Sequence, residues 1–194
     1  MTQPKDYEVR PIVDLGPYIS GKTADFVERG AVFKVLDDWM AESDPSRFFI
    51  ISGPPGSGKT AIAARLFQIS QGEAAPPEGV SYIKSGFLDA VHFCLMNDFR
   101  SISPFYFIES VALQLAARHH GYAEALVKEA TSGEFNVKME NVKAKEVRGV
   151  QIERIKTGEI TIEQSFRRAI LEPLEALYCT GQPGRIIILV DAMA

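Results

Sequence analysis

The sequence predicts an α/β fold of three layers, in which a mainly parallel sheet lies between helices. Three observations predict it: short aliphatic runs typical of buried strands, amphipathic runs between them, and one glycine-rich turn that joins a strand to a helix. The strand candidates are residues 48–52, 88–95 and 186–190. The chain has 194 residues, which fits one domain of ordinary size.

The composition excludes several classes of protein. The chain is 46% hydrophobic and 24% charged, with a formal net charge of −4. This argues against wholesale disorder, and the missing basic excess argues against binding to nucleic acid or to an anionic membrane. No apolar run is long enough to span a bilayer, and residues 1–10 carry no secretory signal. Two cysteines, Cys94 and Cys179, cannot form a disulfide framework, and they have no metal-type spacing. We therefore expect a protein of the reducing cytoplasm.

The first part of the chain predicts an arm followed by helix, strand and helix. Residues 1–23 are polar and interrupted by glycine and proline, so we expect an arm in front of a domain of residues 24–194. Apolar side chains fall on one face of a helix over residues 30–40. The run 48–52 is continuously apolar, which predicts a strand buried on both faces. A second helix follows it and ends at the loop that begins with residue 72.

The second part of the chain predicts two more helices and a β-rich insertion. Ser103 and a following proline predict the start of a helix that reaches about residue 119. Apolar and polar residues alternate over about 134–160, which predicts a β-hairpin or small meander inserted in the domain. Thr161 opens the next helix with a capping box, and we expect Pro173 to kink this helix.

The turn at residues 53–60 carries the strongest motif. It matches G-x-x-x-x-G-K-[ST] in full and lies between a predicted strand and a predicted helix. Glycine lets the backbone N–H groups turn inward around phosphate oxygens, and the helix N-terminus adds partial positive charge. A glycine-rich connection with a solvated lysine is the alternative. The predicted phosphate-binding loop consists of Gly53, Pro54, Pro55, Gly56, Ser57, Gly58, Lys59 and Thr60.

Asp191 follows the third aliphatic strand directly. Carboxyl ends of parallel strands point toward the ligand, so Asp191 could hold Mg²⁺ opposite the Thr60 hydroxyl. We therefore expect Thr60 and Asp191 to be the metal ligands. Lys59, which would reach the β- and γ-phosphates, and Asp191 are the expected catalytic residues. Asp89 is a rival for this role, but it lies inside a predicted strand and not after one.

The phosphate loop and the strand ending in Asp191 together resemble a P-loop NTPase of the additional-strand type. Further likenesses favour the STAND class, which includes the AAA-related NACHT and NB-ARC modules. Residues 25–29 are similar to the entry motif F-x-G-R, residues 90–94 resemble the second strand of bacterial NACHT-like modules, and residues 189–193 resemble the start of h-h-D-A-L-D-E. The resemblance implies ATP and Mg²⁺ as cofactors and a nucleotide contact for Arg29.

Two positions depart from that pattern. Glu28 stands where the entry motif has glycine, and Ala194 stands where the first of two acidic residues would fall. The sequence therefore names no general base. The resemblance also implies a sheet of order 5-1-4-3-2, whose fourth strand follows Asp191. We thus expect a fragment of a longer protein that is marginal, oligomeric or chaperone-bound by itself, and direct pairing of 48–52 with 186–190 would contradict this.

The function expected from these observations is that of a nucleotide-operated signalling switch. MgATP would bind at the loop, and slow hydrolysis or exchange in the intact parent protein would change its state. The resemblance implies protein partners or self-oligomerisation through regions beyond these residues. Two alternatives stay open: a small-molecule or nucleoside kinase, and a scaffold fragment that does not hydrolyse nucleotide. The 52 residues before the loop argue against a kinase, whose loop usually lies near the N-terminus.

Overall fold

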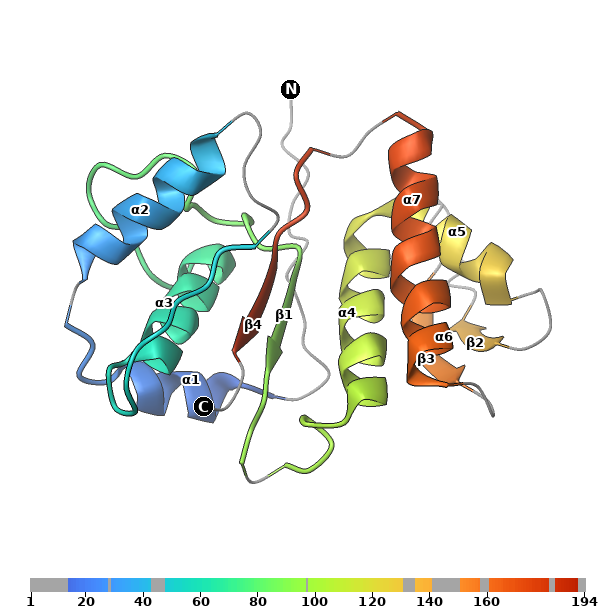
Figure 1. Cartoon of the computed structure of the whole chain (residues 1–194), viewed down its shortest axis with the longest axis horizontal. Coiled ribbons are helices and arrows are strands. Elements are labelled where there is room, and N and C mark those ends of the chain that lie inside the picture. Colours follow the sequence, from blue (N-terminus) through green and yellow to red (C-terminus); the bar gives the residue numbers. More distant parts are fainter. Residues whose placement is uncertain are drawn as a thin grey trace.

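The computed structural model is an α/β structure of mostly helices around a two-stranded parallel sheet (Figure 1). Strand β1 (Ala90–Phe93) lies beside strand β4 (Ile188–Asp191), and Phe93 is opposite Asp191. Helices lie on both sides of this sheet, so the predicted layering is present around two strands. The structure describes residues 14–27, 29–42, 48–96, 98–130, 135–140, 151–157, 161–181 and 184–191.

The helices divide into two groups, one on each side of the sheet (Figure 1). The first group consists of α1 (Gly16–Thr23), α2 (Gly30–Ala41) and α3 (Lys59–Gln71). The second consists of α4 (Pro104–Arg118), α5 (His120–Ala130), α6 (Ile162–Phe166), a π-helical turn (Arg167–Leu171) and α7 (Glu172–Cys179). With these lie the strands β2 (Phe135–Glu140) and β3 (Gln151–Thr157). Helix α5 is an element that the sequence analysis did not predict.

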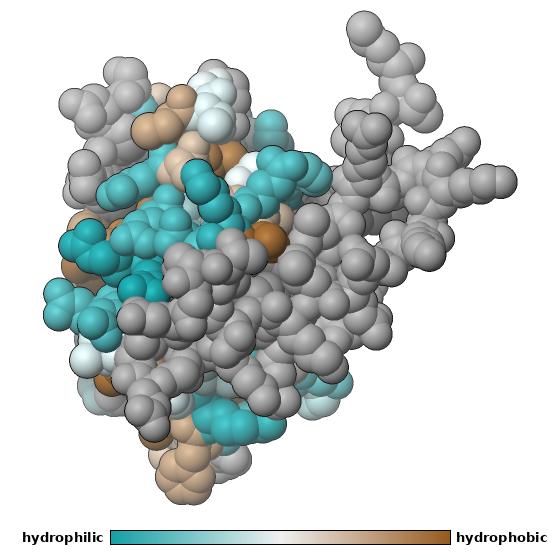
Figure 2. Space-filling model, turned by 90° about the vertical axis from the view of Figure 1, so that its right-hand side faces the viewer, coloured by the Kyte–Doolittle hydropathy of each residue, from teal (hydrophilic) through white to brown (hydrophobic). Residues whose placement is uncertain are grey.

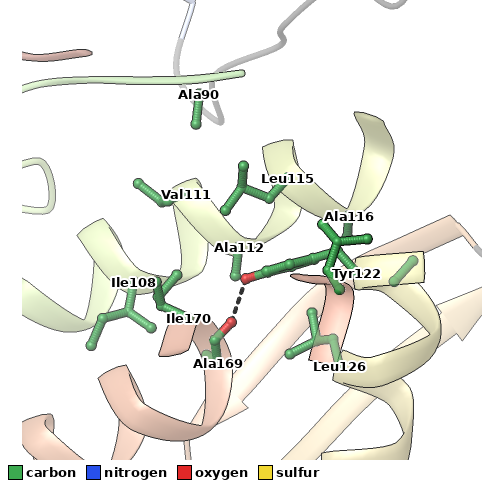
Figure 3. Close-up of a cluster of buried hydrophobic side chains, with 12 residues drawn as sticks. Ala90, Ile108, Val111, Ala112, Leu115, Ala116, Tyr122, Leu126, Ala169 and Ile170 are labelled. Atoms are coloured by element: carbon green, nitrogen blue, oxygen red, sulfur yellow. Dashed lines mark hydrogen bonds between the residues drawn. The ribbon is translucent and has the colours of Figure 1, made fainter. Parts of the chain in front are cut away.

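The largest core cluster joins α4, α5 and α7 and the π-helical turn (Figure 3). Tyr122 is fully buried at its centre, and its hydroxyl donates a hydrogen bond to the carbonyl of Ala169. Burial raises the pKa of the Tyr122 hydroxyl, so it remains a donor. A buried tyrosine needs such a partner, and here the partner lies in the π-helical turn, which this bond ties to α5.

The first of the two corrections concerns the N-terminal arm. Residues 16–23 were predicted to be part of an arm, whereas the structure has helix α1 there. Leu15 and Ile19 are buried against α3, where they contact Ala63 and Phe67. Tertiary packing explains the helix, since two apolar residues one turn apart are enough to bind a short polar helix to a neighbour.

The second correction concerns residues 48–52, which were predicted to form a buried strand. The structure assigns no strand to these described residues, and the side chains of Phe48 and Ile50 are 78% and 82% exposed. An aliphatic run is buried on both faces only where neighbouring strands flank it. The third predicted strand, which is β4, pairs with the second, which is β1. The order 5-1-4-3-2 predicts this pairing.

The edge of β1 that faces away from β4 is closed by a side chain. The backbone N–H of Val91 donates to Oε1 of Gln114 at 3.0 Å, and Nε2 of Gln114 donates to the carbonyl of Val91 at 2.9 Å. The Gln114 amide is buried and offers one donor and one acceptor, as a neighbouring strand would. Both backbone groups of Val91 are thereby satisfied.

Helix α2 is anchored at two places. The Asp37 carboxylate accepts hydrogen bonds from the backbone N–H groups of Ser81, Tyr82 and Ile83. Burial of this carboxylate acts to raise its pKa, but the three bonds together hold the pKa of Asp37 below its ordinary value. At the other anchor, Arg185 donates to the carbonyl of Met40 and, at 2.7 Å, to that of Glu42. Arg185 lies just before β4, so α2 is fixed to that strand.

Two local predictions are confirmed in this second group, one for the strands β2 and β3 and one for the start of α6. Strands β2 and β3 pair antiparallel, as the alternating pattern indicates, with an irregularity between Lys138 and Met139. The capping box is present, since Thr161 and Gln164 exchange side-chain and backbone hydrogen bonds. Pro173 follows the π-helical turn, in which the helix accommodates the missing N–H of proline.

The surface of the second group is mainly polar. On the face that Figure 2 shows, the described residues are mostly hydrophilic, with single apolar side chains among them. Such scattered apolar residues are ordinary on a protein surface. Within the described residues, no helix has the length and apolar character needed to cross a membrane.

Candidate functional site

The loop at residues 53–60 has the backbone that its glycines allow. Gly56 and Gly58 have φ of 78° and 86°, the left-handed region that other residues rarely adopt. At Gly53, an added Cβ would lie 2.8 Å from Oγ of Ser57. Helix α3 begins at Lys59, so the last two residues of the loop already form its first turn. The unpaired N–H groups of its first turn therefore open onto the loop, which is an arrangement that attracts an anion.

The Lys59 side chain lies across this loop. Its Nζ donates to the carbonyl of Gly53 at 2.9 Å and to that of Pro54 at 3.3 Å. The ammonium group is thus held within reach of whatever lies in the loop. Neutral carbonyls are weaker partners for an ammonium group than a phosphate oxygen is, so an anion bound here would compete for Lys59.

Thr60 and Asp191 are brought together from opposite parts of the chain. The Oγ1 of Thr60 donates to Oδ1 of Asp191 at 3.3 Å, across 131 positions of sequence. Partial burial raises the pKa of Asp191, while the hydrogen bond from Thr60 and the positive charges of Lys22 and Lys59 act to lower it. The two expected metal ligands therefore share one location beside the loop.

Arg29 contacts the backbone of the loop. Its guanidinium donates to the carbonyl of Ser57, and it also covers Gly58, where an added Cβ would lie 3.2 Å from a guanidinium nitrogen. The nucleotide contact expected for Arg29 remains a prediction. What the geometry adds is a direct connection between the residue just before α2 and the loop.

Asp89, the rival of Asp191, is engaged elsewhere. Its carboxylate accepts from Nε of Arg118 at 2.8 Å, lies 2.9 Å from Nε2 of His119, and accepts the backbone N–H of Ile187 at 2.7 Å. It is buried by these partners. Asp89 therefore holds the start of β4 against β1, and Asp191 alone faces the loop.

The sequence analysis missed Tyr18 and Lys22, which both belong to α1. The Tyr18 ring lies edge-on to Phe93 with the ring centroids 5.9 Å apart, and Nζ of Lys22 lies 5.4 Å from the Tyr18 centroid. Glycine and proline within residues 14–23 hide the helical period. The spacing of Leu15 and Ile19 was the one available signal, because residues four apart lie on one face of a helix.

The donor set at this location suits a magnesium ion bound together with a phosphate. No group of three or more histidine, cysteine or acidic side chains that could hold a metal occurs among the residues that the structure describes. A hydroxyl and a carboxylate are oxygen ligands of the kind that Mg²⁺ prefers. Since Mg²⁺ commonly takes only one or two protein ligands besides phosphate and water, Thr60 and Asp191 are a sufficient protein contribution.

Comparison with known proteins identifies one family. No curated protein and no solved structure matches the chain significantly. The family model described as nephrocystin 3, N-terminal, matches residues 33–156, which is more than half of the chain. The matched region contains the loop and β1, whereas α1, Arg29 and Asp191 lie outside it. The chain belongs to the nephrocystin 3 N-terminal family.

Proposed function

We propose that this chain binds MgATP, with the phosphates in the loop at residues 53–60 and Mg²⁺ between Thr60 and Asp191. The observation that carries this proposal is the 3.3 Å contact between the Thr60 hydroxyl and the Asp191 carboxylate. A motif match by itself defines only a loop. The contact adds a carboxylate from a distant strand at the place where a metal bound to the phosphates would lie.

Each part of the proposed site has a physical role. The N–H groups of the loop and of the first turn of α3 bind phosphate oxygens, and Lys59 leaves the carbonyls of Gly53 and Pro54 to pair with them. The bound Mg²⁺ supplies positive charge that neutralises the phosphates. Thr60 and Asp191 orient that charge, and Arg29 holds the loop backbone in place through Ser57.

The larger role that we propose is that of a nucleotide-dependent switch of the STAND class within a larger signalling protein. The resemblance of the entry motif and of residues 189–193 supports this assignment. The structure gives no ladder between residues 48–52 and β4, and this supports the assignment over a kinase, because kinase-type P-loop proteins place the strand before the loop beside the strand that ends in the aspartate. Protein partners and ATP hydrolysis belong to the same proposal.

The test is ATP binding by the purified chain, measured by isothermal titration calorimetry with Mg²⁺ and with EDTA. We expect binding with Mg²⁺, at least tenfold weaker binding with EDTA, and loss of binding in Lys59→Ala. Lys84→Ala is the matched control, since Lys84 is exposed and lies in the loop before β1. Equal binding by Lys59→Ala and the unmutated chain would contradict the proposed site.

A second measurement separates the switch from the alternatives. Radiolabelled ATP is incubated with the chain, and retained nucleotide, free phosphate and phosphate on added nucleoside acceptors are quantified. A switch retains nucleotide and releases phosphate slowly, whereas a kinase transfers phosphate to an acceptor. A scaffold that does not hydrolyse ATP retains it unchanged.

A further inference from the structure

The segment that follows β1 exposes four large apolar side chains. Met96 and Phe99 are 80% and 83% exposed, and Ile102 and Phe105 are exposed to a smaller extent. We name these four residues the 96–105 patch. In Figure 1 the segment extends beyond the end of β1 before the chain turns into α4. Apolar side chains gathered in this way, unlike single ones scattered over a surface, mark a site that binds a partner.

A period of three separates the exposed residues of this segment from those that anchor it. The N–H of Asp98 donates to the carbonyl of Leu95 at 3.1 Å, and the N–H of Ser101 donates to the carbonyl of Asp98 at 2.9 Å. In successive turns of this kind, residues three apart lie on one side. Leu95, Asp98 and Ser101 are accordingly half-buried or buried, whereas the first three residues of the patch are exposed.

The segment has a fixed shape. The Ser101 hydroxyl donates to the carbonyl of Asp98 at 2.6 Å and accepts the N–H of Leu95 at 2.7 Å. Nε2 of His92, in β1, lies 2.7 Å from the carbonyl of Ser101. These bonds tie the segment to the sheet. A surface that is already ordered loses little conformational entropy when a partner binds to it.

The charge beside the patch favours an acidic partner. Arg100 donates from Nε and Nη2 to the two carboxylate oxygens of Asp98, at 3.0 and 2.9 Å. The Arg100 side chain is 72% exposed and that of Asp98 only 19%, so the guanidinium faces the solvent and its remaining donors can bind a second carboxylate. Arg100 is the only basic residue of 94–105, whereas attraction to an anionic membrane needs a cluster of basic residues.

We propose that the 96–105 patch binds a short acidic amphipathic helix of a partner protein. The backbone groups of the segment bond within it, and Gln114 closes the outer edge of β1, so a partner has to bind through side chains and not by adding a strand. A helix presents apolar side chains along one face and can place a glutamate beside Arg100. Four side chains offer less surface than the about 800 Å² that each copy contributes to a stable dimer.

The experiment measures fluorescence anisotropy of a labelled helical peptide that carries leucines at i, i+3, i+4 and i+7 with glutamates beside them. We expect Phe99→Ser to bind this peptide about tenfold more weakly than the unmutated chain does. Val35→Ser is the matched control, because Val35 is an exposed apolar residue of α2, and it should bind within about twofold. Thermal unfolding verifies that both variants fold. A peptide with lysines in place of the glutamates should bind the unmutated chain about fivefold more weakly.

Several outcomes would overturn the inference. The unmutated chain might leave the glutamate peptide unbound, Phe99→Ser could bind it as Val35→Ser does, or the lysine peptide could bind equally well. Sedimentation velocity without peptide tests a second copy, since a dimer that Phe99→Ser abolishes would assign the patch to self-association. Binding to vesicles of phosphatidylcholine and phosphatidylserine that requires Phe99 would assign it to a membrane. None of these measurements includes ATP, so their result is independent of the proposed function.

Discussion

The two edges of the parallel sheet differ in how they are closed. On the outer edge of β1, the buried Gln114 amide binds both backbone groups of Val91. On the side of β4 that faces away from β1, Val190 is half-exposed and the apolar residues Phe48 and Ile50 lie exposed. One edge is therefore completed by a side chain of this chain, and the other presents strand-forming residues without a strand beside them.

This difference shows that an apolar run acquires strand structure only with a partner. The run at β1 has a paired strand on one side and an amide on the other, and it is fully buried. Residues 48–52 are just as apolar, yet the structure assigns no strand and no strand pairing to them. Four substitutions test this difference, and they follow in order of decreasing expected effect.

The largest effect is expected at Gln114. Gln114→Leu leaves the N–H and carbonyl of Val91 without partners in a buried place, and should lower the free energy of unfolding by about 2–4 kcal/mol. Urea denaturation measures this value. The control is Ala117→Gln, an exposed change on the same helix, which should stay within about 0.5 kcal/mol. A tolerated Gln114→Leu would show that the amide does not close this edge.

The next effect is expected at Arg185, which joins the approach to β4 with the end of α2. Arg185→Met removes bonds to the last carbonyls of α2 and the contact with Trp39, 5.9 Å from the ring centroid. Because this arginine is exposed, we expect a loss of only about 1 kcal/mol in a urea denaturation experiment. Arg185→Lys keeps the positive charge but loses the planar guanidinium group, and should recover less than half of the lost free energy of unfolding.

A pH effect is expected from His92, which lies in β1 with Nε2 2.7 Å from the carbonyl of Ser101. Burial holds the pKa of His92 below its ordinary value of 6.5, although the bond to Ser101 acts in the opposite direction. Below about pH 6.5 the unfolded chain therefore binds the proton more readily, and the contribution of His92 to stability falls as pH decreases. Urea midpoints between pH 7.5 and 5.5 should drop further for the unmutated chain than for His92→Gln. Parallel pH profiles of the two proteins would exclude this role.

The smallest effect is expected on the open side. Ile50→Thr changes an exposed side chain and should alter the free energy of unfolding by less than about 0.5 kcal/mol. The corresponding change in β1, Val91→Thr, buries a hydroxyl and should cost about 1–3 kcal/mol. Thermal melts of the two variants compare the edges directly. Similar losses at both positions would mean that residue 50 is covered in solution.

Local patterns predicted most of the elements and the two halves of the candidate site. Helix α2, helix α3 and the capping box at Thr161 follow from periodicity and caps, which depend on neighbours in sequence. The loop and Asp191 were found in the same way, since each is a short motif. The 3.3 Å distance between their side chains depends on the sheet and is a finding of the structure.

Other features depend on contacts between distant residues and left no local signal. Helix α1 forms because Leu15 and Ile19 meet α3, and residues 48–52 remain outside a ladder because no described strand pairs with them. The ring of Tyr18 packs on Phe93 of β1, a contact that neither its sequence neighbours nor a motif reports. Tertiary packing outweighs local propensity at each of these positions.

Helix α2 reaches from the loop to the segment that leads into β4. Arg29, immediately before it, donates to the loop backbone, and Arg185, three residues before the start of β4, donates to the carbonyls at its end. The helix has 12 residues, so it acts as a stiff spacer about 18 Å long. The loop and the segment that leads into β4 are thus hydrogen-bonded to opposite ends of one helix and share one mechanical support.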